Sequence, residues 1–191
     1  MSDQSHQIAF VDVRSFSEIP EAHMPVRVPV VLSVVEVRTV LGALAGVPWL
    51  VAVLLYGAGL RLQECLELRV KDVDFDRREV VVRRGKGQKD RRVMLPDAIV
   101  DGLRQHLDGV RRQHYADLAK GFGRVILPGA LERNYPNAPT EWGWQFVFPA
   151  GRICRDARWG PPSRFHLHES VIQRAVAGAE CRLYFLHSLV A

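Results

Sequence analysis

The chain has little cysteine, and what it has is widely spaced. The three cysteines among its 191 residues are Cys65, Cys154 and Cys181. Their odd number and the lack of a Cys-x-x-Cys pair argue against a disulfide framework and against a thiolate zinc site. The cysteine content therefore fits a reducing compartment.

Long hydrophobic runs and a leader sequence are also missing. The longest uncharged apolar run, residues 47–60, contains proline and glycine, is short for a membrane span and is typical of a buried helix. The first residues, "MSDQSHQIAF", lack the basic segment and apolar core of a signal peptide. We expect a cytoplasmic protein without membrane partners.

The composition predicts one compact domain with an uneven charge distribution. The chain is 48% hydrophobic and 25% charged, and its formal net charge is +5. A mild basic excess is compatible with nucleic acid but does not establish it. More informative is the stretch 83–92, in which a single acid, Asp90, accompanies six basic residues: Arg83, Arg84, Lys86, Lys89, Arg91 and Arg92.

Apolar periodicity and capping signals predict several helices and a hairpin. Ser33 and Glu36 form a capping box for a helix to about residue 44, ended by Gly46 and Pro48. A buried helix follows at about 49–57 and a short one at about 61–69. Two β-rich runs within 78–96 flank "GKGQKD" as a hairpin, and "VDVDF" supplies a third strand. A helix of about 20 residues then ends near Gly121.

The stretch 122–164 differs from the rest because it is rich in Gly, Pro, Trp and Arg. Within it, "EWGWQFVFPAG" alternates aromatic residues with the period of a strand. We expect the two phenylalanines, Phe146 and Phe148, to lie in the core. A last helix is predicted at about 168–179, and the final residues follow none of these patterns. The predicted class is α+β, mainly helical, with a small antiparallel sheet.

Two features point to an anionic ligand, and each has a plainer interpretation. Arg61 stands near a helix start, where its charge opposes the helix dipole and needs an anion, either Glu64 or a phosphate. By position alone, a solvated arginine is the commoner case. The basic hairpin is either a soluble exposed turn or a ribbon laid against DNA, with Lys86 reaching the backbone.

Together these residues resemble the tyrosine recombinase (phage-type integrase) family. "YGAGLRLQECLELRVKDVDF" is similar to the family's first arginine box, and "VVVRRGKGQKDRRVMLP" to its lysine hairpin. The later stretch, from "LPGALERNYPNAPTEWGWQFVFPAGRICRD" to "FHLHESVIQRAV", resembles the extra segment of integron integrases. The resemblance covers roughly residues 28–177.

The resemblance implies an activity and roles for individual residues. The family exchanges DNA strands through a 3′-phosphotyrosyl link, without a cofactor or metal. By resemblance, Arg61 holds non-bridging phosphate oxygens, Lys86 protonates the leaving oxygen, and Glu64 supports the arginine. The resemblance also implies contacts with duplex DNA, with folded single-stranded sites and with other recombinase protomers. The implied DNA-binding residues are Arg83, Arg84, Lys89, Arg91, Arg92, Trp142, Trp144, Arg155 and His166.

The chain departs from the family's pattern in its second half. None of its histidines is followed three residues later by arginine, so the His-x-x-Arg box is missing. None of its tyrosines, Tyr56, Tyr115, Tyr135 and Tyr184, follows such a box, so no nucleophile is assigned. We therefore expect an arm or linker at 1–27, a partial catalytic domain at 28–179 with the integron-type insertion at 122–164, and a divergent tail at 180–191.

Three functions remain open from the sequence. The chain is a truncated integron-type recombinase that is inactive alone, a non-catalytic DNA-binding fragment, or a decayed gene product without selected function. Trp142, Trp144 and His166 are either core residues or a stacking surface for extruded bases. Arg152, Arg155 and Arg158 are either phosphate contacts or a solvated loop.

Overall fold

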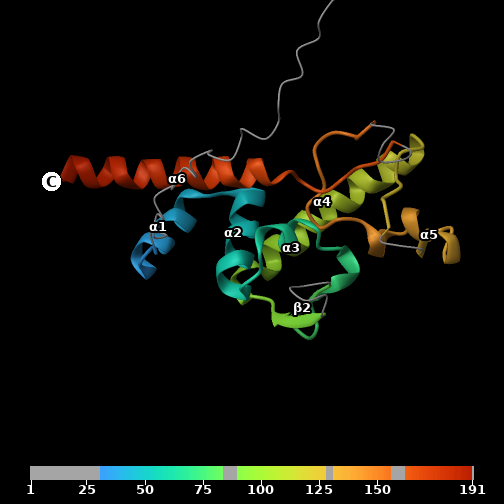
Figure 1. The fold of residues 1–191 in the computed structure, drawn as a ribbon, viewed down its shortest axis with the longest axis horizontal. Coiled ribbons are helices and arrows are strands. Elements are labelled where there is room, and N and C mark those ends of the chain that lie inside the picture. Colours follow the sequence, from blue (N-terminus) through green and yellow to red (C-terminus); the bar gives the residue numbers. More distant parts are fainter. Residues whose placement is uncertain (1–30, 84–89, 128–130, 156–161, 191) are drawn as a thin grey trace, which may run out of the picture. The chain divides into compact units, whose positions relative to one another are not determined.

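The computed structural model describes residues 31–83, 90–127, 131–155 and 162–190. Residues 32–191 form one compact unit, and residues 1–31 are a separate unit. The arm predicted at 1–27 lies outside the described residues, as do Arg84, Lys86, Lys89 and Arg158. The described part confirms the α+β class, because it combines helices with one small antiparallel sheet at the lower edge of the unit in Figure 1.

Three helices open the compact unit, and the first is capped as predicted. Helix α1 spans Val34–Ala43, α2 spans Gly46–Ala58 and α3 spans Leu62–Leu66. The backbone N–H of Glu36 donates to Ser33 Oγ at 3.3 Å, and the backbone N–H of Ser33 donates to Glu36 Oε2 at 2.7 Å. Pro48 falls in the first turn of α2, where its missing N–H leaves no hydrogen bond unmade.

Helix α3 is shorter than the predicted 61–69 because the following backbone pairs elsewhere. The N–H of Val70 donates to the carbonyl of Gln145 at 3.0 Å, and the N–H of Val147 donates to the carbonyl of Leu68 at 2.9 Å. These bonds hold residues 68–70 extended against a segment some 75 positions later in the chain. A 3₁₀ turn, Val70–Asp72, then leads into the sheet.

The sheet confirms the predicted hairpin and the third strand. Strands β1 (Val73–Asp74), β2 (Glu79–Val82) and β3 (Arg91–Met94) pair antiparallel in the order β1-β2-β3. Val82 lies opposite Arg91, and Val81 lies opposite Arg92. Alternation along β2 buries Val80 and Val82. The turn that joins β2 to β3 lies outside the described residues.

Helix α4 (Val100–Ala119) contributes one face to the main core. A 3₁₀ turn, Asp97–Ile99, precedes it, and Gly121 follows it with φ +80°. One apolar stripe of the helix is buried, namely Val100, Leu103, Leu107 and Val110. The predicted end of the helix near Gly121 is therefore confirmed, and a left-handed residue after the helix suits glycine.

The aromatic stretch is not the strand that its alternation predicts. Residues 142–144 form a 3₁₀ turn, after a short helix α5 (Leu131–Asn134) and another 3₁₀ turn, Ala138–Thr140. The four residues from 145 to 148 are all buried, so the run has no solvent face to alternate with. Phe146 and Phe148 are 3% and 1% exposed, which confirms both as core.

Helix α6 (Glu169–Val190) runs past the predicted helix end at about 179, so that predicted end is wrong. It lies beside α1 and α2 (Figure 1), and Ile172 and Ala179 are buried there. Packing against neighbouring helices extends a helix beyond the stretch that periodicity alone identifies. None of the helices in the described ranges is long and apolar enough to span a membrane.

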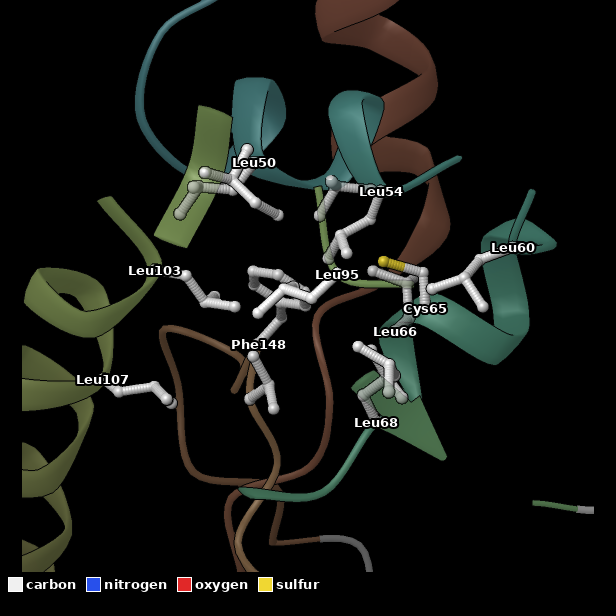
Figure 2. Close-up of a cluster of buried hydrophobic side chains, with 14 of the residues drawn as sticks. Leu50, Leu54, Leu60, Cys65, Leu66, Leu68, Leu95, Leu103, Leu107 and Phe148 are labelled. Atoms are coloured by element: carbon white, nitrogen blue, oxygen red, sulfur yellow. The ribbon is translucent and has the colours of Figure 1, made fainter. Parts of the chain in front are cut away.

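The main core joins the early helices to the later segment. Figure 2 shows side chains of α2, α3 and α4 pointing toward Leu95 and Phe148, which belong to one buried cluster. Phe148 comes from the predicted insertion, so that segment shares the core of the unit. Cys65 lies in the same cluster, and burial raises the pKa of its thiol to about 12. Cys65 is therefore an inert core residue.

Candidate nucleic-acid interface

A groove of about 560 Å³ opens where α3, the sheet and the segment 126–166 meet. Its lining mixes cationic, acidic and aromatic side chains. The cations are Arg61, Arg69, Lys71 and Arg83; the acids are Glu64, Glu67 and Asp72; the rings are Trp144, Phe146, Phe165 and His166. Positive charge beside exposed ring edges is the combination that binds a nucleic-acid backbone and its bases.

Arg61 projects into this groove from the first position before α3. Gly59 ends α2 in the left-handed region with φ +63°, and Leu60 is buried, so the chain turns sharply at this point. The Arg61 side chain is 57% exposed, and its Nη1 donates to Glu64 Oε1 at 3.0 Å. The predicted compensation by Glu64 is therefore present, and it leaves most of the guanidinium accessible.

Glu64 is the acid that organises this end of the groove. Besides Arg61, it receives both Nη atoms of Arg91, at 2.9 Å to Oε1 and 2.6 Å to Oε2. Its Oε2 also accepts the backbone N–H of Arg61 at 2.9 Å. The hydrogen bond from Arg91, opposed by burial and helped by the Arg61 N–H and both positive charges, lowers the pKa of Glu64 to about 2.

The described arginines of the hairpin all pair with acids. Arg83 Nε donates to the buried Asp72 at 2.6 Å, Arg91 binds Glu64, and Arg92 Nη1 donates to Glu79 at 3.3 Å. All three acids lie outside the charged stretch, so counting charges over 83–92 misses them. Of these three arginines, only Arg83 lines the groove.

The two tryptophans of the aromatic stretch take different positions. Trp144 lines the groove, with Lys71 Nζ 2.8 Å from its ring centroid. Burial, followed by the charge of Arg83, lowers the pKa of Lys71. Trp142 instead packs against α4, with its ring centroid 6.0 Å from that of His114. The sequence pattern predicted a pair, but the structure brings only Trp144 to the groove.

His166 also lies in the groove, stacked on Phe165 with ring centroids 4.2 Å apart. Its Nδ1 donates to the carbonyl of Leu167 at 2.8 Å, so Nε2 is the acceptor that lies 3.5 Å from the Gln63 amide nitrogen. Arg155 does not line the groove, and its guanidinium lies 5.8 Å from the Phe122 ring centroid. Thus Trp144, His166, Arg83 and Arg61 are the described predicted residues that meet there, together with Glu64.

Arg69 is the groove residue that sequence reasoning left without a role. Its Nη1 and Nη2 donate to the carbonyls of Trp144 at 2.9 Å and Ile126 at 3.0 Å. Its guanidinium also lies 3.6 Å from the Phe146 ring centroid, and burial lowers its pKa to about 10. The available signal was an arginine directly after the apolar face of α3. Arg69 therefore fixes the wall that carries Trp144.

Two histidines of α4 hold the same segment from the other side. His106 Nε2 donates to the carbonyl of Val147 at 2.8 Å, and His114 Nε2 donates to that of Thr140 at 3.0 Å. Burial is the main cause that lowers the pKa of each. Across the described ranges, no three His, Cys, Asp or Glu side chains gather as metal ligands do.

Comparisons with known proteins match this chain to integrases and recombinases. Residues 44–122 match the Phage integrase family model, a stretch that includes Arg61, Glu64 and the hairpin. An integrase/recombinase of Escherichia coli is 43% identical over 169 residues, covering 88% of this chain and 50% of that protein. The tyrosine recombinase XerA of Thermococcus onnurineus is 40% identical over 88 residues, 44% of this chain and 31% of that one.

The crystal structure of XerA recombinase aligns with 82% of this chain and 43% of that chain, with a TM-score of 0.49 and 22% identity. The chain spans about half the length of the curated integrase/recombinase that it matches over 169 residues.

Proposed function

We propose that the chain is a tyrosine recombinase, because residues 44–122 match the Phage integrase family model, and that its groove binds DNA at recombination sites. The observation that carries this proposal is the accessible Arg61 guanidinium beside the Trp144 and His166 rings in one groove. A planar guanidinium fork suits two phosphate oxygens, and aromatic faces suit unpaired bases. The groove supplies both kinds of contact within one hollow.

The integron branch is part of this proposal. Integron integrases bind folded single-stranded sites whose bases stand outside the stem, and the segment 122–164 resembles their extra segment. Support comes from the way Arg69, His106 and His114 fix this segment while leaving Trp144 and His166 in the groove. We assign Trp144 and His166 to base stacking. Trp142 is a support for the α4 side of the segment.

The catalytic roles follow from the family resemblance. Arg61 holds non-bridging phosphate oxygens, Glu64 orients it, and Lys86 of the hairpin turn delivers a proton to the leaving oxygen. Such groups act by positioning and charge stabilisation. Because the 191 residues contain no His-x-x-Arg box, we propose that they bind a site without completing a covalent exchange. Domain limits at 28–179, with an arm at 1–27, remain part of the proposal.

The test is a binding titration against a DNA hairpin with extruded bases and against a matched duplex, at several salt concentrations. We expect Arg61→Ala to weaken binding about 10-fold or more, the scale of a lost charged hydrogen bond. Arg38→Ala removes an exposed arginine on α1 and is the matched control for net charge. Binding that is insensitive to salt, or equal losses in the two variants, would contradict the proposal.

A covalent assay tests the catalytic part separately. The chain is incubated with DNA that carries a nicked recombination site, and denaturing gels then detect any DNA–protein adduct. We expect none from the 191 residues alone. An adduct would show that a tyrosine of this chain acts as nucleophile, and it would overturn the proposed incompleteness without affecting the binding proposal.

A further inference from the structure

Glu64 is shared between two arginines that come from different parts of the fold. Arg91, on strand β3, occupies both carboxylate oxygens with its two Nη atoms. Arg61, at the start of α3, makes a single side-chain bond to Oε1. The Glu64 side chain is only 11% exposed, so this carboxylate has limited access to water as an alternative partner.

The charges of this triad do not cancel. Two guanidinium groups and one carboxylate leave one positive charge, and the geometry decides where that charge is accessible. Arg91 is the more enclosed arginine, with 35% of its side chain exposed against 57% for Arg61. Arg61 lines the groove and Arg91 does not. The uncompensated charge is therefore presented to the groove by Arg61.

Glu64 makes one side-chain hydrogen bond with Arg61 because its two hydrogen bonds with Arg91 occupy both of its oxygens. A carboxylate and a guanidinium that meet without competition favour a two-bonded fork. If Arg91 were removed, both Glu64 oxygens would lose their Arg91 hydrogen bonds, and Oε2 would keep the bond from the Arg61 backbone N–H. The Arg61 side chain, three residues away on the same turn of chain, would then reach both oxygens. Arg61 would then close onto Glu64 as a neutral pair, turned away from any anion in the groove.

We propose that Arg91 is a positioning residue that keeps Arg61 open to a phosphate group by holding Glu64. This inference rests on the proposed function of the groove, because the anion it serves is a DNA phosphate. Arg91 itself acts at a distance from the anion, since its described hydrogen bonds are spent on Glu64. The role differs from the phosphate contact that sequence density around the hairpin predicts for Arg91.

Arg92 provides a matched control on the same strand. It follows Arg91 directly, so its side chain leaves the opposite side of β3, where it pairs with Glu79 and is 65% exposed. Arg91→Ala and Arg92→Ala therefore remove the same charge from the same hairpin. Any difference between the two variants reflects the contact with Glu64 and not the overall field.

The first experiment is a double-mutant cycle on the affinity for the DNA hairpin probe. We expect Arg61→Ala and Arg91→Ala each to weaken binding about 10-fold, and the double variant to be no more than about 2-fold weaker than either, because both changes disable the same contact. The fold-losses in affinity caused by Arg92→Ala and Arg61→Ala should multiply in the double variant. Multiplying losses for Arg61 and Arg91, or an Arg91→Ala variant with full affinity, would overturn the inference.

The second experiment needs no DNA, so it separates this inference from the proposed function. NMR measures how fast the Arg61 guanidinium rotates about its Nε–Cζ bond. In Arg91→Ala we expect slower rotation than in the wild type, because Glu64 then binds two Arg61 nitrogens, and unchanged rotation in Arg92→Ala. Thermal melts confirm that each variant is folded, and Arg91→Lys, which keeps the charge without the fork, gives a second folded comparison.

The two experiments distinguish the possible failures. If no DNA binds but Arg61 slows as expected, the triad is correct and the proposed function is wrong. If DNA binds through Arg61 but its rotation is unchanged in Arg91→Ala, the proposed function stands and the positioning role is wrong.

Discussion

The two walls of the groove are built by different physical means. The wall from α3 and the sheet consists of regular elements, and its arginines are held by carboxylates, as with Arg83 on Asp72. The wall from residues 126–166 consists of short turns, and donor side chains from other elements bind its backbone carbonyls. Arg69 and two histidines of α4 are such donors.

This difference shows which groups remain for a ligand. In the first wall, Arg61 and Arg83 each use part of their hydrogen-bonding capacity in an ion pair. Of these two described groove arginines, Arg61 has the more exposed side chain. In the second wall, polar backbone groups are used internally, and the surfaces left in the groove are ring faces and edges. The first wall therefore suits phosphates, and the second suits bases.

The largest expected effect on stability comes from removing the Phe148 ring, which packs both walls onto one core. Phe148 is 1% exposed and packs with residues of α2, α3 and α4. We expect Phe148→Ala to lower the free energy of unfolding by about 3–5 kcal/mol, the usual cost for a buried ring. Urea unfolding measures this, with the 60% exposed Tyr135→Ala as control. Equal effects in the two variants would mean that the segment is not part of the core.

The next effect concerns the donor that fixes the second wall. Arg69→Ala removes bonds to two carbonyls and the contact with the Phe146 ring. We expect a loss of about 2–4 kcal/mol in unfolding free energy, because buried acceptors lose charged donors. Arg69→Lys, which keeps the charge but lacks the fork, should recover only part of this loss. Full recovery by lysine would show that charge alone holds the wall.

The second wall should also weaken first in acid. Burial lowers the pKa of His106 and His114 below the ordinary 6.5, so the unfolded chain binds protons that the folded chain resists. The contribution of these histidines to stability is therefore fully present above about pH 6.5 and is lost as the pH falls through their lowered pKa values. The variant His106→Gln keeps a donor for Val147 without titrating. Urea midpoints across pH should decline less steeply for this variant, and an unchanged slope would contradict the assignment.

The first wall should respond at a lower pH than the second. The pKa of Glu64 is lowered from 4.5 to about 2, so its ionised form stabilises the fold above about 4.5 and this stabilisation is lost as pH falls toward 2. The stability difference between wild type and Glu64→Gln should be constant above that range and shrink within it. A difference that already changes near pH 6 would point to another group.

The sequence predicts the first wall better than the second. A capping box identified α1, an uncharged apolar run identified α2, and apolar periodicity identified the hairpin and α4. The run through Phe146 and Phe148 looked like a strand, yet four consecutive residues enter the core and pair with residues 68–70. Such pairing over some 75 positions has no local signal. Arg69 and the two histidines of α4 escaped notice for the same reason, since their partners are distant backbone carbonyls.

Charge density around the hairpin was likewise an incomplete guide. Arg83, Arg91 and Arg92 appear as free positive charge in the sequence, but Asp72, Glu64 and Glu79 reach them in the fold. Arg61 stood out because a glycine break placed it at a helix start, and its partner Glu64 is local. The local part of the site was therefore predictable, and the part that depends on contacts between distant segments was not.

The measurement that tests the groove most directly compares two neighbouring tryptophans. Trp144 lines the groove, and Trp142 packs against α4. Fluorescence anisotropy would give the affinity of Trp144→Ala and Trp142→Ala for the extruded-base hairpin and for the duplex. We predict that Trp144→Ala loses about 10-fold for the hairpin, the scale of one stacked base, and much less for the duplex, while Trp142→Ala has the smaller effect. Equal losses in both variants, or a Trp144→Ala loss that does not depend on the probe, would contradict the assignment of this groove to DNA bases.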